Sequence, residues 1–162
     1  MIAAVDPGTG KFGWVICEDS GELVLSGVSA VNDLEKWARA LLAPDIGVLE
    51  TMAIENSGKS CFERLPAFVL VGSGTGSRSI IERLEVSGLS VKVMPERYST
   101  IRGRALFWKI HPPKGFWRLF PRSLLVPHRN IDDLAAWSLA MDFVGKESTI
   151  LSPEQNCHFR TR

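Results

Sequence analysis

The chain has 162 residues, of which 45% are hydrophobic and 23% are charged, and its formal net charge is +1. This size and composition are typical of one soluble globular domain, and no apolar run approaches the roughly 20 residues of a membrane span. The three cysteines have no paired spacing, which argues against a zinc site and against a disulfide framework. Because the sequence begins in an apolar strand without a signal-peptide pattern, we expect a cytoplasmic protein with no membrane partner.

The first part of the chain predicts three consecutive strands and one helix. The strands are expected at 1–6, 12–18 and 22–29, where apolar runs are separated by turns rich in glycine. Apolar residues then recur at helical spacing over 32–43. The segment 46–66 has no clear pattern, because Val48–Ile54 suits a strand and a helix equally well.

Beyond this segment, strands and helices alternate. The uninterrupted apolar run Ala67–Val71 predicts a strand that is buried on both faces. Further elements are expected as a helix at 77–87, a strand at 89–94, a helical stretch at 99–110 and a helix at 131–144. This order predicts an α/β protein whose mixed central sheet has three antiparallel strands, then parallel strands, and is flanked by helices. Residues 1–145 would form a single domain, and 146–162, which lack periodicity, a loosely packed or flexible tail.

The turn after the first expected strand carries a candidate site residue. Asp6 stands at the end of an apolar run and is followed by Pro7-Gly8-Thr9, and small residues at such a turn let a phosphate or a metal ion approach closely. An aspartate before Pro-Gly is also a common turn former. The sequence Asp-x-Gly-Thr additionally resembles the phosphate-binding turn of actin- and hexokinase-like ATPases, although those proteins need two such domains around a nucleotide.

A second feature is a long basic stretch with no acidic residue. The stretch 97–131 contains eight arginines and lysines and no Asp or Glu, and aromatic residues are interleaved with the basic ones. Such a surface favours phosphates through counterion release, and aromatic rings can stack on bases. A solvated basic face over core aromatics is the alternative reading. We expect contact with nucleic acid, with these candidate residues: Thr9, Arg97, Arg102, Arg104, Lys109, Lys114, Arg118 and Arg122.

Three motifs resemble one group of nucleases. Asp6-Pro7-Gly8-Thr9, with Gly13 in the next strand, resembles the opening of RuvC-type Holliday junction resolvases. Pro95-Glu96-Arg97-Tyr98-Ser99-Thr100 resembles the Asp-Glu-Arg-Leu-Ser-Thr motif of their small relatives, the YqgF-type pre-16S rRNA nucleases. Asp132-Asp133-Leu134-Ala135-Ala136 resembles the start of the last helix in that group. The resemblance covers most of 1–144 and implies an RNase H-like fold.

The resemblance also implies a site. Asp6, Glu96 and Asp132 would be the catalytic carboxylates and would bind Mg²⁺ (or Mn²⁺) for phosphodiester hydrolysis, because hard oxygen ligands hold such ions. Glu55 is an alternative second acid, since Met52-Ala53-Ile54-Glu55 resembles the strand that carries this acid in the junction resolvases. Asp133 is the alternative to Asp132, which helical spacing favours as the inward-facing member of the pair.

The function expected from these features is that of a metal-dependent endonuclease acting on structured RNA or branched DNA. A catalytically inactive RNase H-like protein that binds nucleic acid is the alternative, and an ATPase-like phosphate-binding domain is a third. The sequence leaves the oligomeric state undecided, and a homodimer is one possibility because the junction resolvases act on a two-fold symmetric substrate. Contacts to phosphates position a strand without specifying it, so the basic residues do not separate RNA from DNA.

Overall fold

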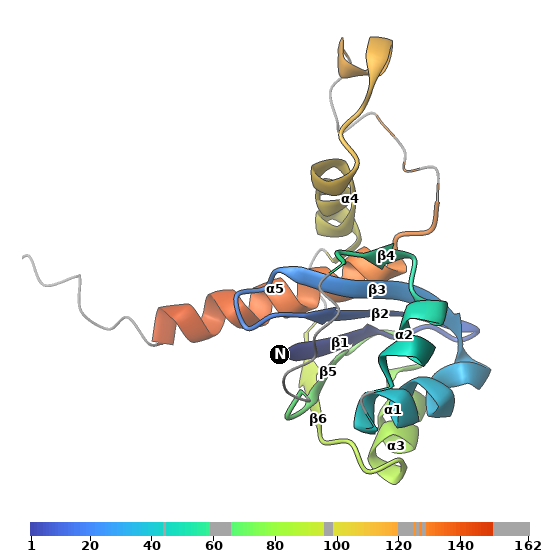
Figure 1. Ribbon diagram of the computed structural model, residues 1–162. Coiled ribbons are helices and arrows are strands. Elements are labelled where there is room, and N and C mark those ends of the chain that lie inside the picture. Colours follow the sequence, from blue (N-terminus) through green and yellow to red (C-terminus); the bar gives the residue numbers. More distant parts are fainter. Residues whose placement is uncertain are drawn as a thin grey trace, which may run out of the picture.

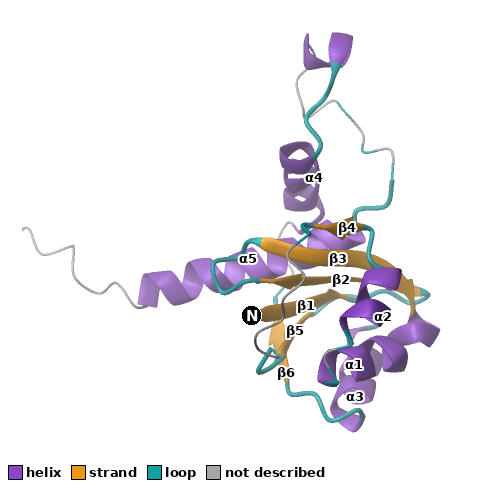
Figure 2. Cartoon of the chain, in the orientation of Figure 1, coloured by secondary structure: helices purple, strands orange, loops and turns teal. Residues whose placement is uncertain are grey.

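The computed structural model describes residues 1–43, 45–58, 66–95, 99–119, 125, 127 and 129–150. These residues form a mixed sheet with helices on both of its faces (Figure 1, Figure 2). The strands are β1 (Ile2–Asp6), β2 (Lys11–Cys17), β3 (Leu23–Ala30), β4 (Glu55–Asn56), β5 (Val69–Gly72) and β6 (Val91–Met94). The helices are η1 (Val31–Asp33), α1 (Leu34–Leu42), α2 (Ile46–Met52), α3 (Ser77–Val86), α4 (Ser99–Ile110), η2 (Gly115–Leu119) and α5 (Asp132–Ile150).

The strand order in the sheet is β4-β3-β2-β1-β5-β6. The pairs β1–β2, β2–β3 and β3–β4 are antiparallel. Strand β5 runs parallel to β1, and β6 runs parallel to β5. The expected α/β class and the mixed sheet, first antiparallel and then parallel, are therefore confirmed. This topology places the carboxyl ends of β1, β5 and β6 at one edge of the sheet, with β1 in its interior.

Two hydrophobic clusters lie on the opposite faces of the sheet because successive side chains of a strand point to opposite sides. From β1, Ala3 and Val5 join the cluster under α1, α2 and α3, whereas Ile2 and Ala4 join the cluster under α4 and α5. All four are fully or almost fully buried, which explains why β1 is a continuous apolar run with a single carboxylate at its end.

Helix α5 lies close to both the sheet and α4. A side-chain carbon added at Gly103 of α4 would stand 3.2 Å from the backbone nitrogen of Ala135, so these small residues let the two helices approach closely. Of the helices in the described ranges, none combines the length and the apolar character needed to cross a membrane.

The structure fills one open segment and corrects two expected boundaries. The segment 46–66, left open by the sequence, contains the helix α2 and the two-residue edge strand β4. The strand expected from Ala67 begins only at Val69, and the last helix, expected to end at Val144, continues to Ile150. Residues 151–162 of the expected tail lie outside the described residues.

Candidate functional site

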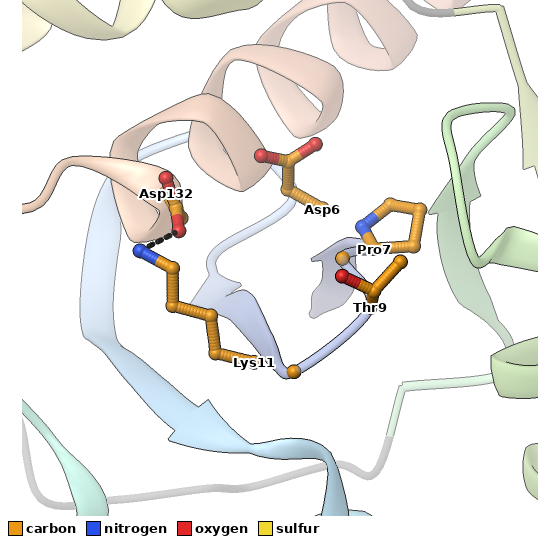
Figure 3. A pocket seen from close by; sticks show the side chains of 7 residues that line it. Asp6, Pro7, Thr9, Lys11 and Asp132 are labelled. Carbon is orange, nitrogen blue, oxygen red and sulfur yellow. Dashed lines mark ion pairs between the residues drawn. The ribbon is translucent and has the colours of Figure 1, made fainter.

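Asp6 and Asp132 line one cavity at the carboxyl end of β1. Its volume is about 530 Å³, and its lining consists of Asp6, Pro7, Gly8, Thr9, Gly10, Lys11 and Asp132 (Figure 3). Asp6 ends β1, Lys11 begins β2, and Asp132 is the first residue of α5. The cavity is therefore built from one strand end, the turn that follows it and the start of a helix far away in the sequence.

Glycines keep the turn of this cavity tight. A side-chain carbon at Gly8 would stand 2.5 Å from the carbonyl oxygen of Lys11, so the turn closes only because this position has no side chain. Gly76 has a positive φ of +85°, and a side-chain carbon there would stand 2.9 Å from the carbonyl oxygen of Gly8. The backbone just before α3 thus packs against the backbone of Gly8 and Thr9 and helps to fix the turn.

Gly13 brings the start of α5 next to Asp6. In the sheet Gly13 is the partner of Asp6 in the register of β1 and β2. A side-chain carbon at Gly13 would stand 2.1 Å from both the carbonyl carbon and the carbonyl oxygen of Asp132, which means that the helix backbone lies directly on the strand. The side chain of Asn130 accepts a hydrogen bond from the backbone nitrogen of Asp132 at 3.2 Å, as expected of a residue at a helix start.

Replacing Gly13 by alanine should therefore lower the free energy of unfolding by roughly 1–3 kcal/mol, the usual cost of inserting a methyl group into filled space. Urea denaturation of both proteins measures the difference. Gly10→Ala in the same turn is the matched control, because a side-chain carbon at Gly10 meets nothing within 4 Å. Equal stability of the two variants would show that α5 does not begin on Gly13.

The charges in the cavity are balanced in part by Lys11. Its Nζ atom lies 2.9 Å from Oδ2 of Asp132 (Figure 3). The exposed fraction is 51% for the Lys11 side chain and 34% for the Asp132 side chain, so water reaches this ion pair. Asp6 comes from the neighbouring strand and faces the same space. The cavity thus presents two carboxylates and one ammonium group to solvent.

A second ionic cluster surrounds Arg129. Its guanidinium contacts both oxygens of Asp133, with Nη1 at 2.8 Å from Oδ1 and Nη2 at 3.1 Å from Oδ2. Nη2 also donates to Oε1 of Glu55 at 2.6 Å, and Nε2 of His111 lies 2.7 Å from the same oxygen. Ser26 of β3 donates its hydroxyl to Oδ2 of Asp133 at 2.8 Å. The cluster therefore links β3, β4 and the end of α4 to the first turn of α5.

Burial and hydrogen bonding compete in this cluster. Burial opposes ionisation of Glu55, but the hydrogen bonds from His111 and Arg129 outweigh it and hold the pKa of Glu55 below its ordinary value. Burial likewise disfavours the charged form of Arg129, but its bonds to Asp133 and Glu55 raise the pKa of the guanidinium. Both groups are charged at neutral pH, and Arg129 sits between two carboxylates.

The expected orientation of the two aspartates is wrong. Helical spacing favours Asp132 as the inward-facing residue, yet Asp133 is the one that is completely buried. The reason is tertiary: Ser26 and Arg129 supply partners that allow a carboxylate to be buried at this point. Asp132 instead turns to the partly exposed cavity, where it joins Asp6. The alternates Glu55 and Asp133 meet each other across Arg129 and are absent from the lining of the cavity.

The remaining predicted residues fall into four groups. Thr9 lines the cavity, and Arg104, Lys109 and Lys114 are exposed on or beyond α4. Arg102 is paired with Asp142 of α5. The residues Glu96, Arg97 and Arg122, together with the side chain of Arg118, lie outside the described residues. Strand β6, which precedes Glu96 in the chain, ends at the same edge of the sheet as β1.

Sequence reasoning missed two basic residues at the site. It assigned no role to Lys11, and it counted Arg129 only as one member of the basic stretch. Arg129 stands four residues before Asp133 but precedes the first residue of α5, so the pairing rule for residues within a helix does not indicate their contact. The contacts of Lys11 with Asp132 and of Arg129 with Glu55 join distant parts of the chain, and no local pattern indicates them.

The donor set of the cavity is suited to a hard cation. Mg²⁺ is commonly bound through one or two carboxylates, with waters and substrate phosphates completing its shell, and Asp6 and Asp132 supply two carboxylates. Within the described ranges, no group of three or more His, Cys, Asp or Glu side chains is placed to hold a metal ion. Comparison of the chain with protein-family models and with curated proteins finds no match. The chemistry of the cavity therefore comes from its two carboxylates, Asp6 and Asp132.

Proposed function

We propose that this chain is an RNase H-like, metal-dependent endonuclease that acts on structured RNA or branched DNA. The observation that carries the proposal is the meeting of Asp6 and Asp132 in one cavity, since these are the first and last acids of the motifs that resemble the RuvC- and YqgF-type nucleases. Both residues would bind Mg²⁺ or Mn²⁺. Glu96 remains the predicted third acid, and the end of β6 just before it, at the edge that holds Asp6, is compatible with that role.

The arrangement of the sheet supports the same proposal. Three antiparallel strands are followed by parallel strands, and the carboxylate of Asp6 leaves the carboxyl end of β1, as the resemblance implies. Polar groups at the carboxyl ends of parallel strands gather at one edge, where ligands of open α/β sheets commonly bind. Asp132 reaches that edge from α5, because Gly13 allows the helix to begin on β2.

The residues of the cavity have separate roles in this proposal. Asp6 and Asp132 supply negative oxygens on two sides of the open space, and Thr9 offers a hydroxyl group beside them. A bound Mg²⁺ would supply an activated water and neutralise the charge that develops during hydrolysis. Water's oxygen would bond to phosphorus, the ester P–O bond would break, and the leaving oxygen would take up a proton. Gly10 in the turn borders open space, because a side-chain carbon there would meet nothing within 4 Å, so a sugar-phosphate backbone could approach at this point.

A cleavage assay tests the proposal directly. Labelled RNA hairpins and four-way DNA junctions are incubated with the protein in Mg²⁺, in Mn²⁺ and in EDTA. We expect cleavage of at least one substrate class in the two metal ions and none in EDTA. Binding of both substrates without cleavage in either metal ion would contradict a nuclease and favour the second candidate below.

The second candidate is a nucleic-acid-binding protein with the same fold and no catalysis. The ion pair between Lys11 and Asp132 favours it, because an ammonium group already occupies one of the two carboxylates. In the described part of the chain, the cavity also lacks a third acid. Binding of Mn²⁺ separates the two candidates, since only the nuclease needs an ion at Asp6.

The basic residues beyond the sheet give a prediction that both candidates share. The chain from the last turn of α4 to η2 forms an arm that extends away from the sheet (Figure 1), and Lys109 and Lys114 are exposed on it. The double substitution Lys109→Gln, Lys114→Gln should weaken nucleic-acid binding about ten-fold and reduce the slope of log affinity against log salt by roughly 2, because two phosphate contacts are lost.

Fluorescence anisotropy at several salt concentrations measures this effect. Lys36→Gln, on the exposed side of α1, is the control, because α1 covers the other face of the sheet from α4. An equal loss in the Lys36 variant would mean that net charge, and not the arm, governs binding. An unchanged affinity in the double variant would remove Lys109 and Lys114 from the interface.

A further inference from the structure

Lys11 stands in the cavity where its ammonium group and a divalent ion would compete for Asp132. Its ammonium group is 2.9 Å from Oδ2 of Asp132, and both residues line the cavity together with Asp6 and Thr9 (Figure 3). The ammonium therefore occupies one of the two carboxylate oxygens of Asp132 that could bind a divalent ion. Of the residues that line this cavity, Lys11 is the one with a positively charged side chain.

This ion pair is of a kind that opens easily. Half of the Lys11 side chain and a third of the Asp132 side chain are exposed, and exposed ion pairs contribute little to stability because water screens them. The ammonium is carried on a flexible chain of four carbons and can turn away without moving β2. A divalent ion between Asp6 and Asp132 would repel the ammonium at short range, while its own attraction to two carboxylates would be stronger. Binding of the ion and release of Lys11 are thus coupled.

Release leaves the ammonium at the rim of the cavity. Thr9 and Gly10 are exposed residues of the same cavity lining, and a nucleic-acid backbone that reaches Asp6 would pass them. Lysine binds phosphate as a point charge without strict demands on geometry. We propose that Lys11 is an ion-dependent phosphate ligand: it holds Asp132 while no divalent ion is bound, and it contacts a substrate phosphate once the ion displaces it. The proposal rests on the proposed function of the cavity, because it requires a divalent ion at Asp6 and Asp132.

The first experiment measures Mn²⁺ affinity by isothermal titration calorimetry, without substrate. Removal of the competing ammonium in Lys11→Gln should tighten Mn²⁺ binding roughly two- to five-fold, which corresponds to the strength of an exposed ion pair. Lys11→Arg, which keeps the charge, should bind Mn²⁺ as the unmodified protein does, and so should the control Lys36→Gln. Thermal melts of all four proteins confirm equal folding.

The second experiment measures binding of an RNA hairpin with and without Mn²⁺, at low temperature, with intact RNA verified on the same samples. Lys11→Gln should bind like the unmodified protein without Mn²⁺. With saturating Mn²⁺ it should bind several-fold more weakly, with a salt slope reduced by about 1, because one phosphate contact is lost. Lys11→Gln should therefore raise the affinity for Mn²⁺ and lower the affinity for RNA in Mn²⁺. A merely structural role of Lys11 would not change the two affinities in opposite directions.

The outcomes separate this proposal from the function on which it rests. If the unmodified protein binds no Mn²⁺, both the nuclease and the role of Lys11 are overturned. If the protein binds Mn²⁺ and Lys11→Gln leaves that affinity unchanged, the nuclease stands and the competition is overturned. If Mn²⁺ binds more tightly but the RNA affinity stays the same in the ion, the role of Lys11 as a phosphate ligand is overturned.

Discussion

Replacing Asp6 by asparagine should reduce Mg²⁺-dependent cleavage about 10²- to 10³-fold, which corresponds to roughly 3–4 kcal/mol of transition-state stabilisation. Asparagine keeps the size of the side chain but removes the charge that would bind the ion. Because Asp6 is partly buried, lines the cavity and is absent from the hydrophobic core, and because asparagine keeps its size, we expect the fold to be retained. Initial rates on the substrate that the unmodified protein cleaves best give the measurement.

Glu85→Gln is the control for this substitution, because it removes an exposed carboxylate from the end of α3. Asp132→Asn should resemble Asp6→Asn, since both residues line the same cavity. Circular dichroism and melting temperature of each variant establish that the loss is not one of folding. If Asp6→Asn cleaved at the rate of the unmodified protein, the cavity would not be the catalytic site.

Replacing Arg129 by glutamine should lower the free energy of unfolding by about 3–5 kcal/mol, the usual effect of removing one partner of a buried ion pair. The carboxylate of Asp133 is fully buried, and without Arg129 the hydroxyl of Ser26 would be its remaining side-chain donor among the described residues. Glu55 would lose a hydrogen bond at the same time. Urea denaturation measures the change.

The control for Arg129 is an arginine in an exposed ion pair. Arg78 is 93% exposed and pairs with Glu82 one helical turn away, and Arg78→Gln should cost less than about 1 kcal/mol. A double variant, Arg129→Gln with Asp133→Asn, should recover part of the lost stability, because the uncompensated buried charge is gone. A loss in Arg129→Gln as small as that in Arg78→Gln would show that the cluster is not a buried ionic network.

The sheet and most of its elements could be predicted from the sequence because they depend on local patterns. The continuous apolar run of β1 and the helical spacing in α1 are properties of neighbouring residues. Strand β4 could not be predicted, because its two residues are too few for any periodicity and its identity depends on pairing with β3, where Glu55 lies opposite Ser26. Tertiary pairing, not propensity, decides such an edge strand.

In the candidate site, too, some features could be predicted from local sequence and others depend on tertiary contacts. Asp6 and Asp132 could be selected because each stands at the boundary of an element and in a motif. The burial of Asp133 could not be predicted, because it depends on Ser26, which lies far away in the sequence. The pairing of Lys11 with Asp132 has the same cause, since it exists only after α5 has packed on β2.

The proposed nuclease requires Asp6 and Asp132 to hold a divalent ion. A crystal of the protein soaked in Mn²⁺ tests it most directly, through the anomalous signal of the metal. We predict a peak in the cavity with oxygens of Asp6 and Asp132 among its ligands, and the same map will show whether Glu96 joins them. Mn²⁺ bound elsewhere on the protein, with no peak at Asp6, would contradict the account.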